Sequence, residues 1–471
     1  MRICLIAEGS YPYVTGGVSS WIHGLMTSMK EHEFIIYAIG AETKQKGKYK
    51  YQFPPNLVEI KEIFLDEYQF EEKKWGKRYN ITSQQKESFI ALLTTKQDVI
   101  WNDLFDLIRS NTFSNISDFL SSKDYFDLVE SLGRNRYSQV PFTELFWTIS
   151  SMLLPLLSII RHNPPEADIY HAVSTGYAGV IGTLAKHLYN KPLLLTEHGI
   201  YSREREEEII KADWVKGYFK DIWINYFYTL SSSIYTAADQ VITLFNNNKE
   251  IEIELGCPEE KIRIIPNGVN VNDYQNLETI PKDDVIRIGA IVRIVPIKDI
   301  KTMIQSFALV EKEISNVELY IMGPIEENPT YYDECKQIVE TLGVENIVFT
   351  GLVNIKDYLG KMDFLLLTSI SEGQPLAILE GMACKKPFVC TNVGGCKELL
   401  MGGNDDTFGQ AGFIVPVMHY EEMAHYIIEL CKNHKIREQF GKNGYERVKN
   451  NYTRSTFISC YRQLYQSLGG E

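Results

Sequence analysis

Two cations in the second half of the chain, Arg293 and Lys298, have the spacing and the surroundings of an anion site. Four residues separate them in the stretch VRIVPIK, and Pro296 stiffens the loop that carries them. An arginine fork and a lysine point charge together suit a diphosphate. The alternative is a pair of ordinary surface cations. Their position after an apolar run, in an acidic protein, favours the anion site.

Two glutamates, Glu372 and Glu380, follow in the stretch TSISEGQPLAILEG. Pro375 fits the first position of a helix, and one face of that helix would carry Leu376, Leu379, Glu380 and Ala383. A carboxylate on an apolar face is costly without partners, and two ligand hydroxyls would satisfy it. The free N–H groups at the helix start favour a phosphate. The segment therefore predicts a nucleotide-sugar site; the alternative is an ordinary helix-start Glu372 and a solvated Glu380.

Glycines and histidines follow the apolar runs of the first half in the same way. Gly16 and Gly17 have no Cβ, so their N–H groups could come close to an oxyanion, although a Gly-Gly pair can also be only a turn. His198 follows LLLTE at a predicted strand end, where its side chain could project into a cleft. His171 is a similar candidate. For each histidine the alternative is a satisfied structural role.

Short apolar runs, separated by glycine-rich or polar loops and helical segments, must position these groups. Most of the runs are continuous rather than alternating, which is typical of strands buried on both faces of a parallel sheet. They form two series, residues 2–7, 34–39, 168–172, 193–196, 240–244 and 263–265, then 285–292, 317–322, 347–350, 364–368, 388–391 and 413–415. Helical periods between the runs indicate βαβ units. The predicted fold class is α/β with two doubly wound domains.

The polar stretch 272–284, which contains Pro281, is interpreted as the linker between these domains. The predicted division is a first domain over residues 1–280, a second over 281–452, and a C-terminal helix over 453–471 that docks back on the first. Residues 41–165 break the pattern, and they predict a mostly helical insertion in the first domain. Within them, the uncharged stretch 145–160 is too short to span a bilayer and is interpreted as a core helix.

Composition excludes several classes of protein. The chain has 471 residues, of which 44% are hydrophobic and 23% charged, as expected for a soluble globular protein. Its 48 basic and 61 acidic residues give a net charge of −13, which argues against binding of nucleic acid or of an anionic membrane surface. Eight cysteines without a C-x-x-C pair predict reduced thiols in a cytosolic protein. The N-terminus gives no signal peptide, and no carboxylate pair at a strand end predicts a metal.

Together these pieces resemble the retaining glycosyltransferases of family 4, whose GT-B fold has two Rossmann-like domains facing across a cleft. The matching residues are Gly16-Gly17-Val18, Pro266-Asn267-Gly268-Val269, Arg293 with Lys298, Ser371-Glu372-Gly373, Pro375, Glu380, and Asn392-Val393-Gly394-Gly395 with Glu398. The resemblance is strongest over residues 285–417. The stretches AEGSYPYVTGGVSSWIHGL, TEHGIYSRER and TSISEGQP look like one subgroup, the PelF-like enzymes of Pel exopolysaccharide synthesis. That subgroup is associated with UDP-glucose as the donor.

The resemblance also implies roles for individual residues. Arg293 and Lys298 would hold the diphosphate and stabilise its charge as it leaves. Glu380 would bind the ribose hydroxyls and Glu372 would contact the transferred sugar. His198 would project toward that sugar from the acceptor domain. The implied donor-binding residues are Gly16, Gly17, Arg293, Lys298, Gly323, Glu372, Gly373, Leu376, Ala377 and Glu380, with the amides near Leu376 and Ala377 receiving a phosphate and Gly17 approaching the phosphates on closure.

The implied activity is that of a cytoplasmic hexosyltransferase of exopolysaccharide and biofilm synthesis. It would take a UDP-sugar as donor, a glycan as acceptor and no metal or other cofactor, and it could work with a membrane-bound polysaccharide synthase complex. Three alternatives stay open: a nucleotide-sugar 2-epimerase, a glycan phosphorylase and a non-catalytic nucleotide-sugar sensor. The phosphorylase needs a lysine-bound pyridoxal phosphate, for which no signal is found. A sensor has no need to stabilise a leaving group with two cations.

Overall fold

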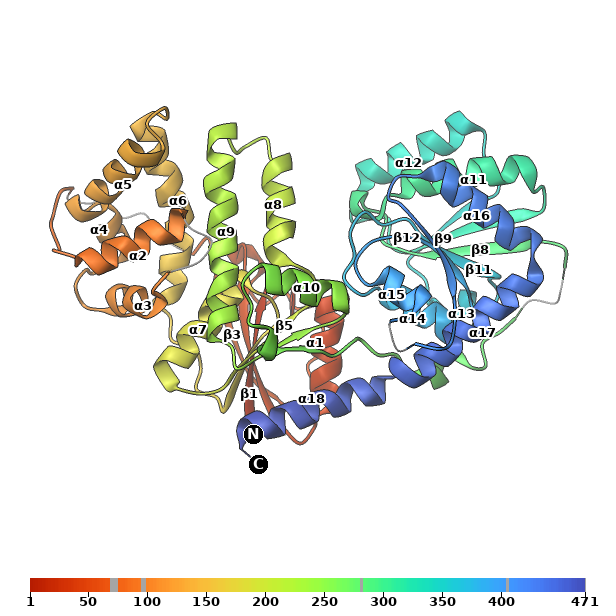
Figure 1. The fold of residues 1–471 in the computed structure, drawn as a ribbon, viewed down its shortest axis with the longest axis horizontal. Helices are drawn as coiled ribbons and strands as arrows, with labels where there is room; N and C mark the ends of the chain where they lie inside the picture. The colour runs from red at the N-terminus through yellow and green to blue at the C-terminus, as the bar shows by residue number, and fades with distance from the viewer. Residues whose placement is uncertain (68–74, 95–98, 280–282, 404–405, 471) are drawn as a thin grey trace. The chain divides into compact units, whose positions relative to one another are not determined.

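The computed structural model describes residues 1–67, 75–94, 99–279, 283–403 and 406–470, which form two compact units (Figure 1). Unit 1 consists of the described residues in Met1–Thr243, Lys249–Ile264 and Tyr461–Glu471. Unit 2 consists of those in Leu244–Asn248 and Ile265–Cys460. Unit 2 thus begins before the polar stretch 272–284, and Pro281 of that stretch lies outside the described residues.

Unit 1 is built on a seven-stranded parallel sheet in the order β3-β2-β1-β4-β5-β6-β7. The strands are β1 (Arg2–Glu8), β2 (Glu33–Gly40), β3 (Leu57–Phe64), β4 (Ile169–Ala172), β5 (Leu193–Glu197), β6 (Gln240–Thr243) and β7 (Ile262–Ile264). Four central strands, β1, β2, β4 and β5, are almost wholly buried, which is why they read as continuous apolar runs. The helices that join them are α1 (Gly17–Ser28), α7 (Gly176–Tyr189), α8 (Tyr201–Lys211), α9 (Gly217–Ala237) and α10 (Asn246–Glu254), together with the short turns η1 (Thr43–Gln45) and η2 (Glu259–Lys261).

Residues 41–165 are mostly helical among the described residues, as predicted, but they also contain the edge strand β3. Its sequence, LVEIKEIF, mixes apolar and charged residues, and only its last two residues are buried. An edge strand with one exposed face gives such a weak apolar signal, and the pattern of continuous apolar runs therefore does not predict it. The helices of this region are α2 (Ser83–Thr94), α3 (Trp101–Arg109), α4 (Ile116–Leu120), α5 (Lys123–Arg136) and α6 (Phe142–Ile160).

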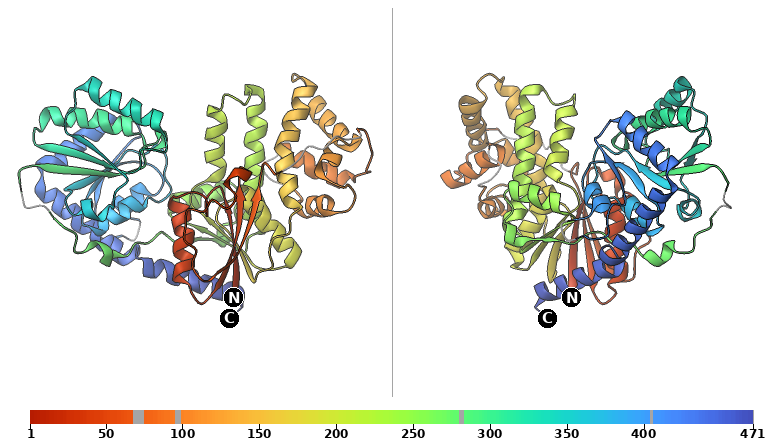
Figure 2. Two further views of the ribbon diagram at one scale, coloured as in Figure 1. Left: turned by 180° about the vertical axis from the view of Figure 1, so that it is seen from behind. Right: turned by 45° about the vertical axis from the view of Figure 1, so that its right-hand side comes forward.

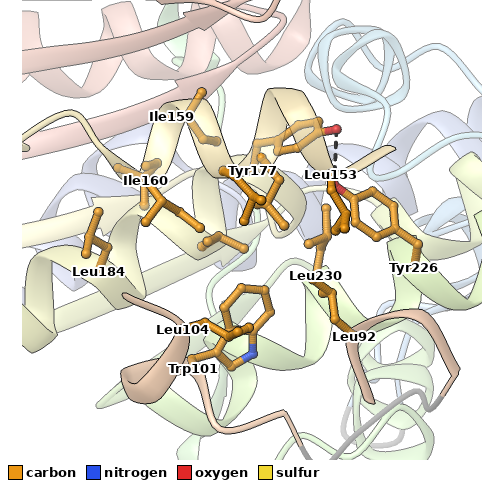
Figure 3. Close-up of a cluster of buried hydrophobic side chains, with 14 of the residues drawn as sticks. Leu92, Trp101, Leu104, Leu153, Ile159, Ile160, Tyr177, Leu184, Tyr226 and Leu230 are labelled. Carbon is orange, nitrogen blue, oxygen red and sulfur yellow. Dashed lines mark hydrogen bonds between the residues drawn. The ribbon is translucent and has the colours of Figure 1, made fainter. Parts of the chain in front are cut away.

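Helix α6 is the core helix of this insertion. Within the described part of the chain, it is the one helix long and apolar enough to cross a membrane by length and composition, and 61% of that stretch is buried inside the protein. Its residues Leu153, Ile159 and Ile160 pack in an apolar cluster with Tyr177 of α7 and Tyr226 of α9 (Figure 3). Helices α2 to α5 lie on the outer side of α6 and α9, away from the strands (Figures 1 and 2).

Unit 2 has a six-stranded parallel sheet in the order β10-β9-β8-β11-β12-β13. The strands are β8 (Ile286–Ile291), β9 (Val317–Met322), β10 (Ile347–Gly351), β11 (Phe364–Leu367), β12 (Phe388–Thr391) and β13 (Gly412–Val415). The helices are α11 (Ile300–Glu313), α12 (Pro329–Leu342), α13 (Lys356–Leu359), α14 (Leu376–Ala383), α15 (Cys396–Met401), α16 (Tyr420–Lys432) and α17 (His434–Asn451), with the turns η3 (Val271–Tyr274) and η4 (Pro296–Lys298). Helices cover both faces of the sheet (Figure 1). Both units are therefore doubly wound α/β structures, as predicted.

The last helix, α18 (Arg454–Gly469), ends within unit 1. Its Tyr465 hydroxyl lies 2.7 Å from Nδ1 of His171 on β4, and its Tyr461 hydroxyl lies 2.9 Å from Oγ1 of Thr196 on β5. Tyr461 and Tyr465 are both fully buried. This face of α18 therefore packs on the unit 1 sheet.

Candidate functional site

The strand order of unit 2 reverses between β8 and β11, and ligands of such sheets bind at this kind of reversal, beyond the carboxyl ends of the strands. The loop after β8 carries Arg293 and Lys298, and the loop after β11 carries Glu372. Hydrogen bonds to the backbone join these loops. The Thr368 hydroxyl donates to the Lys298 carbonyl (2.9 Å), and the Ile370 N–H donates to the Ile297 carbonyl (2.9 Å).

Lys298 and Glu372, 74 residues apart in sequence, form the centre of this site. The Nζ of Lys298 lies 2.5 Å from Oε1 of Glu372, and the Ser369 hydroxyl donates to the same carboxylate oxygen at 2.6 Å. Only 17% of the Lys298 side chain and 11% of the Glu372 side chain are exposed. A partly buried pair of this kind is costly to break from one side, because the remaining charge loses its partner. The predicted diphosphate cation and the predicted sugar-contacting carboxylate therefore contact each other.

Arg293, the second predicted cation, is paired elsewhere. Its Nη1 lies 2.9 Å from Oε2 of Glu327, in the segment between β9 and α12, and both side chains are exposed to water. An exposed ion pair is worth little and can be exchanged for another anion. Behind Arg293, Gly323 packs so closely that a Cβ there would lie 1.9 Å from the Val292 carbonyl oxygen. A side chain at position 323 would therefore collide with the backbone at the end of β8, which explains the glycine.

Helix α14 begins one residue later than the sequence predicts. Pro375 is the N-cap, with φ −71° and ψ 120°, and Leu376 is the first helical residue. The prediction of Pro375 as the first helical position is therefore wrong by one residue. The extended conformation of Pro375 ends the preceding loop, and its carbonyl accepts from the Ile378 N–H (3.2 Å). The N–H groups of Leu376 and Ala377 have no partner within the helix and stay available for an anion, as every helix start offers.

The loop that precedes α14 is held by a neighbouring glycine turn. The Gly395 N–H donates to the Gly373 carbonyl (2.8 Å), and Gly394 has φ +50°. A Cβ on Gly394 would lie 2.1 Å from the Glu372 carbonyl oxygen. Only glycine allows this approach, which fixes the backbone of Glu372 and Gly373.

Glu380 lies half-buried on α14, and the Tyr274 hydroxyl donates to its Oε1 at 3.1 Å. Burial raises the pKa of Glu380, while the Tyr274 hydrogen bond and the charge of Lys356 lower it in part. The carboxylate thus has a protein partner on one oxygen, and among the described residues no hydrogen bond reaches its Oε2.

The unit 1 candidates lie at the carboxyl ends of β1 and β5. Gly16 is the N-cap of α1 and Gly17 its first residue, and a Cβ on either would meet no other atom within 4 Å. His198 follows β5, and its ring meets that of Trp21 edge-on at 4.8 Å. Burial lowers the pKa of His198 to about 4, so the ring is neutral at pH 7. Its Nε2 is buried without a hydrogen-bond partner among the described residues.

His171 has a structural role rather than a position in the candidate site. Both ring nitrogens are engaged, Nδ1 with the Tyr465 hydroxyl and Nε2 with Thr196 Oγ1 at 2.8 Å, and the residue is fully buried. It anchors α18 to the sheet and has no nitrogen left for a ligand.

Several residues of the site were not found by sequence reasoning. Ser369, Tyr274, Glu327 and Gln374 each bond to a candidate residue or its loop, yet three of them lie far from their partners in sequence. Only Ser369, three residues before Glu372, had a local signal. No group of three or more histidine, cysteine, aspartate or glutamate side chains stands ready to hold a metal ion within the described residues.

The two parallel sheets define a doubly wound α/β fold, and comparisons with known proteins give the chain a family. Residues 1–260 match the family described as "Domain of unknown function (DUF3492)", and residues 276–447 match "Glycosyl transferases group 1". The chain belongs to the DUF3492 family, whose model matches more than half of it. Its residues 276–447 are similar to the group 1 glycosyltransferases.

Individual relatives agree with that assignment. The capsular polysaccharide biosynthesis glycosyltransferase CapM of Staphylococcus aureus is 25% identical over 338 residues, 69% of this chain and 82% of CapM. The Mycolicibacterium hassiacum MMP α-(1→4)-mannosyltransferase is 24% identical over 263 residues, 55% of this chain and 61% of the relative.

Solved structures share the fold over the whole chain. Anabaena HepE, in complex with UDP and glucose, superposes with a TM-score of 0.61 at 16% identity, covering 99% of this chain and 100% of HepE. Sucrose-phosphate synthase of Thermosynechococcus elongatus gives a TM-score of 0.62 at 15% identity, covering 100% and 99%. The predicted GT-B fold class is confirmed.

Proposed function

We propose that this glycosyltransferase moves a hexose, with UDP-glucose as the donor, to a glycan acceptor in exopolysaccharide synthesis, with retention of the anomeric configuration. The observation that carries the proposal is the grouping at one sheet edge of unit 2. The strand order reverses at this edge, and three groups lie in the loops and the helix that follow. They are the Lys298–Glu372 pair, the N–H groups of Leu376 and Ala377 at the start of α14, and the half-buried Glu380.

The comparisons support the choice of donor and acceptor. HepE structures contain UDP, UDP with glucose, or UDP-glucose, and they share this fold. CapM acts in capsular polysaccharide biosynthesis, which supports a glycan acceptor. The PelF-like subgroup, a cytoplasmic location and a membrane-bound polysaccharide synthase as partner belong to the same proposal.

The proposed chemistry is carried by charge. The bond between the sugar C1 and the β-phosphate oxygen breaks, and its electron pair goes to the departing UDP. The acceptor hydroxyl oxygen bonds to C1 on the same face, and its proton passes to the departing phosphate. Lys298, Arg293 and the start of α14 stabilise the negative charge that develops, which is the largest contribution to catalysis in such transfers. Because these groups supply the positive charge, no metal ion is needed.

In this scheme the diphosphate replaces Glu327 as the partner of Arg293. It shares Lys298 with Glu372, which stays in place. Glu372 faces the transferred sugar, where positive charge develops at C1. His198 belongs to unit 1 and is neutral at pH 7, so it can form hydrogen bonds but brings no positive charge.

The test is incubation of the protein with UDP-glucose, with and without a glycan acceptor, while UDP release is followed. A preceding thermal-shift screen over UDP-glucose, UDP-galactose, UDP-N-acetylglucosamine, GDP-mannose and ADP-glucose selects the donor, because a bound ligand raises the melting temperature. We expect acceptor-dependent UDP release that EDTA does not abolish. UDP release with a rearranged sugar and no acceptor would indicate an epimerase, and binding of no nucleotide sugar would refute the proposal.

A further inference from the structure

The Pro266-Asn267-Gly268-Val269 motif has no role in the site as described so far. Its last three residues begin a short segment, residues 267–274, that ends with the turn η3. The segment contacts the α14 region at two places, one at each of its ends.

The first contact holds the loop before α14. The Asn267 N–H donates to Oε1 of Gln374 at 2.6 Å, and the Asn267 side-chain amide donates to the Gln374 carbonyl at 3.3 Å. Both residues are buried. The segment is itself fixed, because a Cβ on Gly268 would lie 2.3 Å from the Thr453 carbonyl oxygen and Val269 pairs with Thr453 in a parallel bridge.

The second contact reaches the carboxylate of Glu380. Val271 is buried in the unit 2 core and anchors η3, and three residues later the Tyr274 hydroxyl donates to Oε1 of Glu380 at 3.1 Å. Gln374 and Glu380 bracket the N-terminal part of α14. The segment therefore contacts both the loop before α14 and the carboxylate of Glu380 on that helix.

Two further groups influence the electrostatics of Glu380. Lys356 of α13 attracts its charge, forms an ion pair with Asp273 at 3.2 Å, and places its Nζ 5.4 Å from the centre of the Tyr274 ring. Cys384, one turn further along α14, has its own pKa raised by burial and by the charge of Glu380. Tyr274 is the group that makes a hydrogen bond with the carboxylate.

We propose that Tyr274 is a positioning residue for the donor nucleotide, which fixes Oε1 of Glu380 so that Oε2 is presented to the two ribose hydroxyls. The inference rests on the proposed function, because it takes Glu380 as the ribose-binding carboxylate. Without the tyrosine hydroxyl, the carboxylate keeps its burial but loses the partner that sets its rotation. A free rotor must then be ordered by the ligand, and that ordering costs affinity.

The test compares Tyr274→Phe with Tyr320→Phe. The control removes a similar hydrogen bond in the same unit, where the Tyr320 hydroxyl donates to Glu318 at 2.8 Å. Each variant keeps its ring, so packing is preserved, and melting temperature reports the fold. UDP affinity is measured by calorimetry, with 2′,3′-dideoxy-UDP as a second probe that lacks the ribose hydroxyls.

We expect Tyr274→Phe to weaken UDP binding roughly tenfold, in the range of one charge-assisted hydrogen bond, while Tyr320→Phe binds normally. Binding of 2′,3′-dideoxy-UDP should be equal in wild type and Tyr274→Phe, because that probe makes no use of Glu380. In turnover, KM for the donor should rise and kcat should change little.

A pH profile gives an independent measurement. The Tyr274 hydrogen bond lowers the pKa of Glu380, so its loss raises that pKa and the donor KM of Tyr274→Phe should begin to rise at a higher pH on acidification than that of wild type. Equal weakening toward UDP and toward the dideoxy probe would show a merely structural role and overturn the inference, as would unchanged UDP affinity. If wild type binds no UDP, the proposed function fails instead.

Discussion

Lys298 and Glu372 form an ion pair in which the 2.5 Å contact joins the loop after β8 to the loop after β11. Both side chains are largely shielded from water, and Ser369 completes the pair with a hydrogen bond to the same carboxylate oxygen. The pair lies where the strand order of unit 2 reverses. A phosphate that reaches Lys298 must therefore share it with a carboxylate that is already in place, which preorganises both groups before the donor binds.

The cations are expected to act mainly on turnover. Arg293→Ala and Lys298→Ala should each reduce kcat by about 10²–10³-fold, the range for one preorganised donor to a developing negative charge. Lys301→Ala is the control, because Lys301 forms an ordinary exposed ion pair with Glu334 at 2.7 Å in the same unit. Steady-state kinetics with UDP-glucose measure the effect. Near wild-type turnover in both Arg293 and Lys298 variants would contradict the diphosphate assignment.

Glu327 should compete with the donor for Arg293. Glu327→Gln removes the competing charge while keeping the side-chain size, so UDP should bind more tightly, by up to about fivefold, the value of one exposed ion pair. Glu334→Gln, which removes the carboxylate that pairs with Lys301, is the matched control. Calorimetric titration with UDP measures the change. Weaker binding in Glu327→Gln would show that Glu327 supports Arg293 instead.

Glu252 of α10 should make stability depend on pH. It is fully buried, and burial together with the nearby Glu197 raises its pKa above the usual 4.5, while the Thr243 hydroxyl lowers that pKa in part. The folded state therefore holds a proton that the unfolded state releases above about pH 4.5, and stability should fall as the pH rises from there toward the folded pKa.

Glu252→Gln should flatten this part of the stability profile and make the protein more stable than wild type at pH 9. Urea unfolding at pH 6 and pH 9 measures it, with the exposed Glu250→Gln on the same helix as control. A wild-type stability that is constant between these pH values would rule out a buried, protonated Glu252.

Most of the fold follows from local signals in the sequence. Strands such as β9 and β12 are buried runs bounded by loops, and their limits match the apolar runs, Val317–Met322 and Phe388–Thr391. β3 could not be found in this way, because an edge strand keeps charged residues such as Glu59 and Lys61 on its exposed face. The insertion helices pack through aromatic contacts. Composition shows that aromatic residues are frequent there, but it does not show which of them contact each other.

The site was less accessible from sequence, since its contacts are long-range. Strand-end positions placed Lys298 and Glu372 at one edge of a sheet, but nothing local shows that they pair with each other. Tyr274 and Glu380 are 106 residues apart, and Arg293 and Glu327 are 34 apart. Side-chain partners at such separations are set by the register of strands and helices, which a single sequence does not reveal.

The two glutamates should separate binding from chemistry. Glu380 is proposed to hold the ribose, which does not change during transfer, so its interaction is equally strong in the ground state and the transition state. Glu380→Gln should therefore raise the donor KM and leave kcat less affected. Glu372 is proposed to face C1 of the transferred sugar, where positive charge develops, so Glu372→Gln should lower mainly kcat.

The structure adds a second reason for the Glu372 effect. Glu372→Gln also removes the partner of Lys298, which then becomes free to bind the diphosphate more strongly in the ground state. We therefore expect the Glu372→Gln enzyme to combine a lower kcat with an equal or lower donor KM, the opposite of Glu380→Gln. Steady-state kinetics and calorimetry with UDP measure both. A Glu372→Gln enzyme with normal kcat, or a Glu380→Gln enzyme with unchanged UDP affinity, would defeat the assignment of roles.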